Sequence, residues 1–159
     1  MTALASRGSD SEGLAASLHV ERVAFLVGSP SQRDVLFHLA ELTGNDWLPS
    51  QRAFFLSALC DREAVTTTAI GGGIAVPHAR LSHLDRCRVT VGLAPAGVVW
   101  HARDNQAVRL IVMIAAREQA RTEHLRLLAE IASRLGDLER RERIIHAMSA
   151  EEALHELSG

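Results

Sequence analysis

The stretch "AIGGGIAVPHAR", residues 69–80, places a histidine shortly after three consecutive glycines. An imidazole with a pKa of ~6.5 is largely neutral near pH 7 and is then a nucleophile. Such a ring can accept a phosphoryl group and release it again. Pro77 restricts the backbone before His78 and would hold the ring in a defined direction. The glycines at 71–73 indicate either a turn that needs positive φ or a close approach to the backbone.

Several groups near His78 in the sequence are of the types that bind phosphate. Glycine-rich loops expose N–H groups, so Gly72 and Gly73 are candidates to receive an anion. Thr67 and Thr68 add hydroxyl donors in the adjoining segment, and Arg62 lies just before them. A guanidinium group is a permanent cation whose planar fork matches phosphate oxygens. Together these residues predict phosphoryl chemistry that works by positioning and charge stabilisation.

The elements before His78 form the first half of a predicted α/β unit. The β-prone run at 22–28 predicts a strand, and a capping box at its end predicts a helix over 29–44. A second helix, capped by Ser50, is predicted over 50–63. The β-branched run 64–70 and the segment before His78 are both predicted to be extended, the latter because a following proline disfavours helix.

The second half of the chain supplies further strands and three helices. Alternating polarity over 87–94 predicts a half-buried strand, and the apolar run 108–116 predicts a central strand. Helical spacing predicts helices over 121–135, 138–148 and 149–159. We therefore expect one α/β domain over 19–159, with a mixed central β-sheet flanked by α-helices.

Composition narrows the class of protein. The chain has 159 residues, of which 47% are hydrophobic, and a formal net charge of −2. That balance gives no reason to expect nucleic acid as a partner or direct membrane insertion. Two cysteines without metal-like spacing and the lack of a signal-like N-terminus predict a cytoplasmic location. Residues 1–18, rich in Ser, Gly and Ala, are predicted to form a flexible tail.

The segment 63–79, "EAVTTTAIGGGIAVPHA", resembles the active-site signature of the fructose/mannitol/nitrogen-type EIIA domains of the bacterial phosphotransferase system. In that signature an acidic or amide residue precedes Ile-Gly, two variable residues, Ile-Ala-Val-Pro-His and a small residue. The resemblance continues through "DNQAVRLIVMIAA" at 104–116 and "EHLRLLAEIASRL" at 123–135, and it covers about residues 20–158. The matching signature positions are Glu63, Ile70, Gly71, Ile74, Ala75, Val76, Pro77, His78 and Ala79.

This resemblance implies roles for particular residues. His78 would be the phosphorylated histidine, and His124 a second active-site histidine that donates to the phosphoryl group or steadies the first ring. Arg62 matches an arginine that lies beside the phosphate in the family. The sequence departs from the family pattern at two positions, where Ala107 and Arg109 replace a proline and an acidic residue that are frequent in the family. These departures bear on which partner protein the chain prefers.

The resemblance leaves two functions open, and the residues suggest a third. In a regulatory, nitrogen-type role, an HPr-like phosphocarrier protein would phosphorylate His78 and so change the affinity for regulatory protein targets. In a transport role, the phosphoryl group would pass to an EIIB domain for uptake of a fructose- or mannitol-class sugar. A metal-dependent hydrolase using His78 and His124 lacks a suitable carboxylate or cysteine ligand set. No cofactor and no metal are expected.

Overall fold

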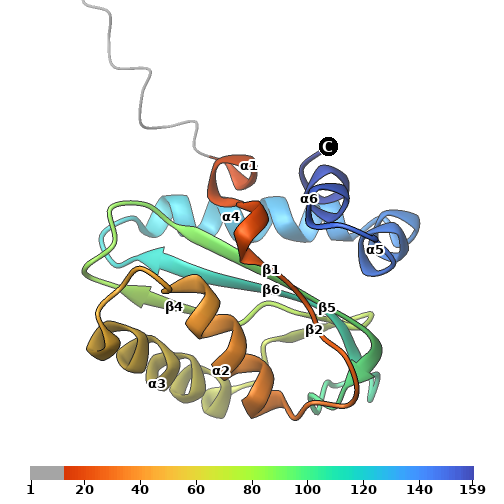
Figure 1. Ribbon diagram of the computed structural model, residues 1–159, viewed down its shortest axis with the longest axis horizontal. Coiled ribbons are helices and arrows are strands. Elements are labelled where there is room, and N and C mark those ends of the chain that lie inside the picture. Colours follow the sequence, from red (N-terminus) through yellow and green to blue (C-terminus); the bar gives the residue numbers. More distant parts are fainter. Residues whose placement is uncertain (1–12) are drawn as a thin grey trace, which may run out of the picture.

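A six-stranded mixed β-sheet forms the centre of the protein, as the computed structural model shows for residues 13–159 (Figure 1). The strand order is β1-β5-β6-β3-β2, and β4 also pairs with β6. β5 and β6 are antiparallel, whereas β3 and β4 run parallel to β6. The strands are β1 (Val23–Phe25), β2 (Ala69–Gly71), β3 (Ile74–Ala75), β4 (His78–Leu81), β5 (Arg88–Val98) and β6 (Val108–Arg117).

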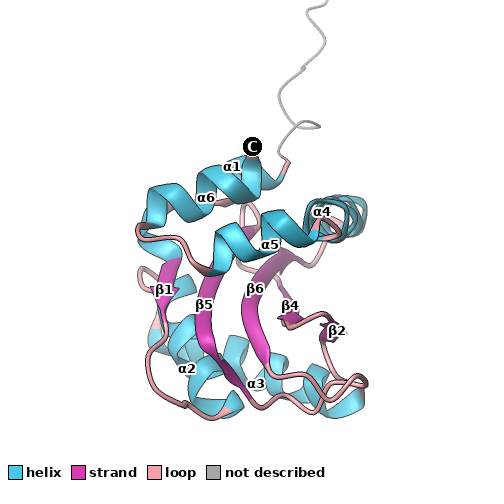
Figure 2. Ribbon diagram, turned by 90° about the vertical axis from the view of Figure 1, so that its right-hand side faces the viewer, coloured by secondary structure: helices cyan, strands magenta, loops and turns pink. Residues whose placement is uncertain are grey.

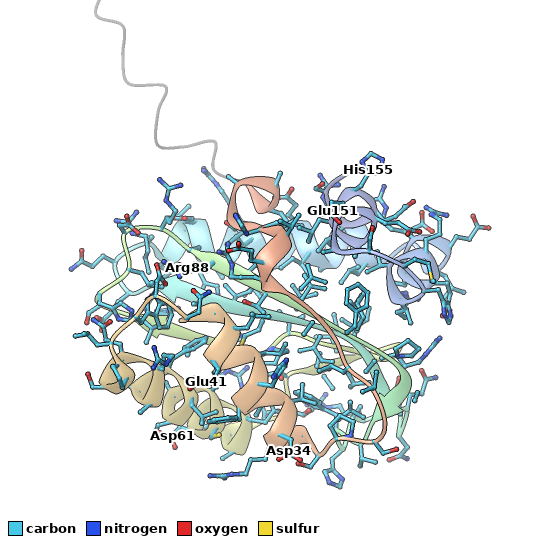
Figure 3. The ribbon with its side chains drawn as sticks, viewed as in Figure 1. Asp34, Glu41, Asp61, Arg88, Glu151 and His155 are labelled. Carbon is cyan, nitrogen blue, oxygen red and sulfur yellow. The ribbon has the colours of Figure 1, made fainter. Side chains whose placement is uncertain are left out.

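Helices cover both faces of this sheet, which confirms the predicted fold class. α2 and α3 pack on one face, and α1, α4, α5 and α6 lie on the other (Figures 1 and 2). Charged side chains such as Asp34, Asp61 and Glu151 point outward from these layers (Figure 3). The helices are α1 (Leu14–Ser17), α2 (Gln32–Thr43), α3 (Pro49–Val65), α4 (Arg121–Leu135), α5 (Leu138–Ile145) and α6 (Ala150–Ser158), with a short 3₁₀ helix at Val20–Arg22.

β5 is buried on both faces, so the prediction of a half-buried strand was wrong. Val91 packs in the core beneath α4–α6, while the opposite face meets α2. Thr90, which looked like a solvent-facing position, is fully buried, and its hydroxyl lies 2.6 Å from that of Thr43 on α2. A hydroxyl that finds a partner inside a helix–sheet contact can occupy a core position, and sequence alternation does not reveal that partner.

The N-terminal segment differs from the flexible tail predicted over 1–18. Residues 1–12 lie outside the described residues, but α1 packs against the layer formed by α4–α6. The side chain of Leu14 is fully buried, and its N–H donates to the Glu130 carboxylate on α4 at 2.9 Å. A single apolar residue in a Ser/Ala/Gly-rich context carries no periodicity, so the sequence does not show this contact.

The run predicted to be extended from residue 64 begins later. α3 continues to Val65, whose side chain is 82% exposed, and β2 starts at Ala69. A β-branched residue has no pleated surface to pack on at such a position, so its strand preference carries little weight. Within residues 13–159, no helix has the length and apolarity required to traverse a membrane.

Candidate active site

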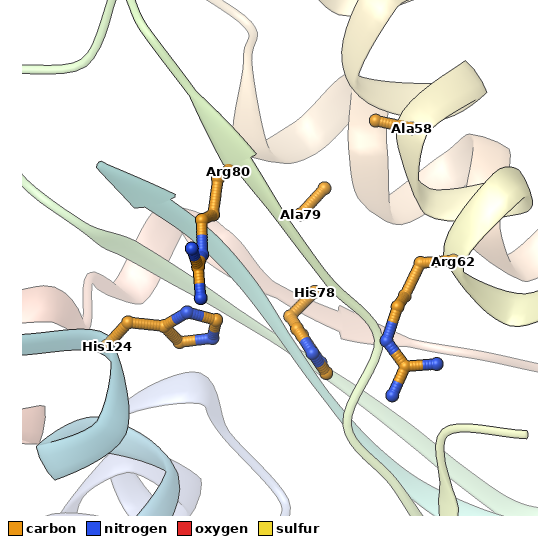
Figure 4. Close-up of a pocket in the computed structure, with 6 residues that line it drawn as sticks. All are labelled: Ala58, Arg62, His78, Ala79, Arg80 and His124. Carbon is orange, nitrogen blue, oxygen red and sulfur yellow. The ribbon is translucent and has the colours of Figure 1, made fainter. Parts of the chain in front are cut away.

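His78 and His124 line one cavity of about 390 Å³, although they lie far apart in the sequence. The extended segment after the glycines runs alongside β6, and it ends with His78 at the start of β4. The first turn of α4 brings His124 to the same place, and the two ring centroids are 5.1 Å apart. The cavity is lined by Ala58, Arg62, His78, Ala79, Arg80 and His124 (Figure 4).

The His78 ring is held by the backbone of its own segment. Its Nδ1 lies 2.9 Å from the carbonyl oxygen of Val76. Because a carbonyl oxygen can only accept, Nδ1 carries the hydrogen and donates it. Nε2 then keeps its lone pair in the neutral ring. Partial burial lowers the pKa of His78, an effect that the Val76 carbonyl partly offsets, so the ring is neutral at pH 7.

His124 is buried, and its ring has no polar partner among the residues that the structure describes. Its side chain is 3% exposed, and neither ring nitrogen has a hydrogen-bond partner within the described chain. Burial is the main cause that lowers the pKa of His124 to about 4. Repulsion from the positive charges of a protonated His78 and of Arg80 contributes to the same lowering of the pKa. A buried polar group without a partner costs about 1–3 kcal/mol, so such a group calls for a functional explanation.

These two histidines predict a loss of stability on acidification. In the unfolded chain both rings titrate near a pKa of ~6.5, whereas in the folded chain both pKa values are lower. The unfolded state therefore binds more protons as the pH falls from about 6.5 toward 4, and the free energy of unfolding decreases there. We expect His124 alone to contribute a loss of about 2 kcal/mol between about pH 7 and pH 4.5 in urea titrations. The His124→Leu variant should show a shallower slope; an unchanged slope would contradict the assignment.

Arg62 approaches His78 from the side opposite His124. It lies in the last turn of α3, and its guanidinium donates to the Thr66 carbonyl oxygen at 3.0 Å. Figure 4 shows its side chain directed toward the His78 ring, with the His124 ring on the other side. The imidazole of His78 is thus flanked by a permanent cation and by a second imidazole.

Of the two threonines, only Thr67 keeps its hydroxyl available as a donor. The Thr67 hydroxyl accepts the Ala69 N–H at 3.1 Å, and the residue lines a second cavity of about 270 Å³ together with Arg62 and His78. Thr68 is 5% exposed, and its hydroxyl and N–H both donate to the Glu63 carboxylate. Thr68 lines the same second cavity, but both of its donors are already bonded to Glu63.

Glu63, part of the sequence signature, had no assigned role. Its carboxylate accepts both Thr68 donors and also the indole N–H of Trp100, at 3.0 Å. Trp100 is 1% exposed, so a largely buried network fixes the end of α3 against the core. Since Arg62 precedes Glu63 directly, the network also fixes the backbone position from which the Arg62 side chain extends.

This network predicts a large and non-additive stability effect. Glu63→Ala leaves three donors without their acceptor, so we expect a loss of about 3 kcal/mol in the free energy of unfolding. Thr68→Val removes one hydroxyl with little change of shape and should cost about 1 kcal/mol. In the double variant the Thr68→Val cost should largely vanish, as measured by urea unfolding followed by circular dichroism. Strict additivity would show that the two side chains act independently.

Gly72 and Gly73 lie away from the cavity that holds the two histidines. The Gly72 N–H donates to the Asp104 carboxylate at 2.9 Å, and the Gly73 carbonyl oxygen accepts from Arg109 and Leu110. Both glycines have positive φ, 65° and 78°, and a Cβ at Gly72 would lie 2.1 Å from the Arg141 guanidinium. The glycines serve a tight β2–β3 turn and a close approach, and neither lines the cavity.

Arg80 is a cavity residue that the sequence reasoning missed. It lies two positions after His78 on β4, and this spacing places both side chains on one face of the strand. The two-residue spacing from His78 along a strand was the sequence signal that could have identified Arg80. Within residues 13–159, no group of three or more His, Cys, Asp and Glu side chains is arranged to hold a metal ion.

Comparison with known proteins places these features in a family. Residues 16–159 match the family model described as "Phosphoenolpyruvate-dependent sugar phosphotransferase system, EIIA 2". A nitrogen regulatory protein of Bradyrhizobium diazoefficiens is 37% identical over 98 residues, which is 62% of this chain and 61% of that protein. A mannitol-specific phosphotransferase enzyme IIA component of Staphylococcus aureus is 36% identical over 101 residues, which is 62% of this chain and 66% of that protein.

The matched region covers less than two thirds of those relatives, at 61% and 66%. Solved structures extend the likeness to the fold as a whole. The nitrogen regulatory protein IIA-Ntr of Neisseria meningitidis superposes with a TM-score of 0.81 at 24% identity, covering 90% of this chain and 97% of that one. IIA mannitol of Escherichia coli gives 0.71 at 27% identity, covering 88% and 98%. Because the family model matches residues 16–159 of this chain, the chain belongs to the EIIA 2 family of the phosphoenolpyruvate-dependent sugar phosphotransferase system.

Proposed function

We propose that the protein is a phosphohistidine carrier that accepts a phosphoryl group on Nε2 of His78. The observation that carries this proposal is the contact between His78 Nδ1 and the Val76 carbonyl oxygen, at 2.9 Å. It fixes the tautomer in which Nε2 is the nucleophile. The lowered pKa of His78 keeps that lone pair free of a proton at pH 7.

The transfer is an in-line displacement between two imidazole rings. The Nε2 lone pair of His78 forms the new P–N bond while the P–N bond to the donor histidine breaks. The donor ring, protonated on its other nitrogen, keeps the electron pair of that bond and leaves as a neutral imidazole. The product ring on His78 retains its Nδ1–H, which the Val76 carbonyl oxygen continues to accept. Little covalent chemistry is left to the protein, so the surrounding residues act through position and charge.

Arg62 and His124 supply that charge stabilisation from opposite sides. The Arg62 guanidinium offers N–H donors and a permanent positive charge to the phosphoryl oxygens. Neutral His124 has one N–H donor without a partner in the described chain, and a phosphoryl dianion on His78 would provide the missing acceptor. The nearby dianion would also raise the pKa of His124 from its low value of about 4, and strengthen this bond.

The donor in this proposal is an HPr-like phosphocarrier protein, and the role is regulatory and nitrogen-type. The likeness to the nitrogen regulatory protein of Bradyrhizobium diazoefficiens, at 37% identity, supports that role. Phosphorylation would then add a dianionic phosphoryl group to the ring and change the affinity for protein targets.

Sugar transport is the second candidate role. It is supported by the mannitol-specific relative at 36% identity, and by the solved complex of enzyme IIA mannitol with phosphorylated enzyme IIB mannitol from Escherichia coli. That structure matches this chain with a TM-score of 0.73 at 27% identity. In this role the phosphoryl group would move from His78 to an EIIB domain.

Incubation with enzyme I, HPr and phosphoenolpyruvate tests the carrier function. We expect the intact mass to increase by one phosphoryl group, through a bond that is stable to alkali and labile to acid. The chain contains no lysine and no tyrosine, which removes two other sources of alkali-stable phosphorylation. Absence of any mass gain with donors that label a control EIIA would reject the proposal.

Addition of EIIB domains to the purified phosphoprotein separates the two roles. Transfer of the label to a fructose- or mannitol-class EIIB domain within seconds would support transport. Retention of the label, together with a protein target bound by only one of the two states, would support regulation.

A further inference from the structure

Arg80 is a cation in the His78 cavity without a partner in the described chain. It makes no hydrogen bond or ion pair to any other residue in 13–159, and no carboxylate lines the cavity. Other arginines at the ends of the central strands are paired. Arg88 bonds Asp46, Arg109 bonds Glu142, and Arg117 lies 3.7 Å from Glu123. Arg80 therefore stands apart from the arginines that serve structural ion pairs.

The position of Arg80 brings it to His124. Since Arg80 and His78 share one face of β4, both side chains enter the same cavity. Figure 4 shows the Arg80 guanidinium beside the His124 ring, on the side of His78 away from Arg62. A guanidinium without a partner in residues 13–159 thus adjoins an imidazole that is 3% exposed and whose nitrogens also lack partners there.

We infer that Arg80 and His124 together form an oxyanion-binding site that holds the phosphoryl group during its transfer to His78. The inference rests on the proposed function and adds a residue to it. A phosphoryl group in transfer spreads negative charge over three equatorial oxygens, and one cation cannot face all three. Arg62 covers one side of the His78 ring, and the Arg80–His124 pair covers the other.

Both members of the pair gain from an oxyanion. The guanidinium of Arg80 places positive charge against the phosphoryl oxygens, and the same charge disfavours protonation of the free His124 ring. An oxyanion supplies an acceptor for the His124 N–H and a counter-charge for Arg80. The polar atoms of this cavity that lack partners among the described residues are therefore complementary to a phosphoryl group.

Two phosphoryl donors, one a protein and one a small molecule, distinguish this inference from the alternative that Arg80 only contacts the donor protein. We would compare the rates of Arg80→Ala, Arg80→Lys and Arg33→Ala with that of the wild type, using phospho-HPr and, separately, phosphoramidate. Arg33 is an exposed residue of α2 outside the cavity and serves as the matched control. If Arg80 holds the phosphoryl group, Arg80→Ala should slow labelling by about 10–100-fold with both donors. Arg80→Lys should restore part of the rate, and Arg33→Ala should match the wild type.

The alternative outcomes are distinct. Slowing with phospho-HPr alone would mean that Arg80 contacts a carboxylate of the partner, and it would overturn the inference. Equal rates for all variants with either donor would overturn it as well. If the wild type itself is not labelled by either donor, the proposed carrier function fails instead.

A binding measurement tests the oxyanion site without any transfer. Inorganic phosphate in millimolar amounts should shift the His124 ring signals in the ¹H–¹⁵N spectrum of the wild type near pH 7. The same titration of Arg80→Ala should require at least about tenfold more phosphate, since one of the two groups is lost. An undisturbed His124 ring in the wild type, or equal titrations of the two proteins, would contradict the site.

Discussion

The His78→Gln variant is expected to take up no phosphoryl group from phospho-HPr, while it folds as the wild type does. Glutamine has similar size and polarity, but its amide nitrogen has no available lone pair and cannot form the P–N bond. The ring is half-buried, and its one hydrogen bond within residues 13–159 is to the Val76 carbonyl oxygen, so its loss should change stability by less than about 1 kcal/mol. Intact-mass spectrometry measures the labelling, and circular dichroism measures the fold.

An exposed histidine provides the control. His155 points away from the sheet on α6, and His155→Gln should be labelled to the same extent as the wild type (Figure 3). Retention of label in His78→Gln would place the acceptor elsewhere. Long-range ¹H–¹⁵N spectra of the phosphoprotein should show the group on Nε2 of His78, since the Val76 carbonyl oxygen occupies Nδ1. A group on Nδ1 would contradict the proposed orientation of the ring.

The second large effect is expected for His124→Leu, which should slow phosphoryl transfer by about 10²–10³-fold. The variant removes the N–H donor that lies beside the His78 ring at a centroid distance of 5.1 Å. At the same time the unfolding free energy should stay constant or rise by about 1 kcal/mol, because an unsatisfied buried ring is replaced by an apolar side chain of similar volume. Rates come from quenched-flow labelling, and stability from urea unfolding near pH 7.

Opposite signs for rate and stability distinguish this role from a structural one. A merely structural residue would lower stability and rate together. His124→Gln, which keeps an amide donor, should lie between the wild type and His124→Leu in rate. A His124→Leu variant that transfers at the wild-type rate would remove His124 from the mechanism.

The periodic elements of this fold could be predicted from sequence because their patterns are local. α4 begins and ends where its apolar spacing predicts, at 121 and 135. The helix predicted over 149–159 is present as α6 (Ala150–Ser158), and the Ser149 hydroxyl caps it by accepting the Glu152 N–H at 3.1 Å. The mixed sheet follows from the same strands and helices, since few arrangements bury their apolar faces.

What the sequence could not predict are contacts that join distant segments. The burial of Thr90 depends on Thr43, a partner on another element, so alternation along one strand was misleading. The glycines were assigned to the phosphate because of their type, whereas positive φ and the approach of Arg141 account for Gly72.

The same limit applies to the site itself. The resemblance to the EIIA signature implied that His78 and His124 share one site, and the structure places both rings in one cavity. Arg80 and the Glu63–Trp100 bond carry no recognisable motif. Their importance depends on which side chains have partners, and pairing is a property of the folded chain alone.

The bond between the Trp100 indole and the Glu63 carboxylate gives the protein an internal optical reporter. The emission of an indole ring responds to a charged group that is bonded to its N–H, here the Glu63 carboxylate. Glu63 directly follows Arg62 in the chain. With Trp47 replaced by phenylalanine, Trp100 becomes the sole fluorophore of its kind. We expect events at the histidine pair that displace Arg62 to shift the emission wavelength of Trp100, so that transfer can be followed in real time without any attached label.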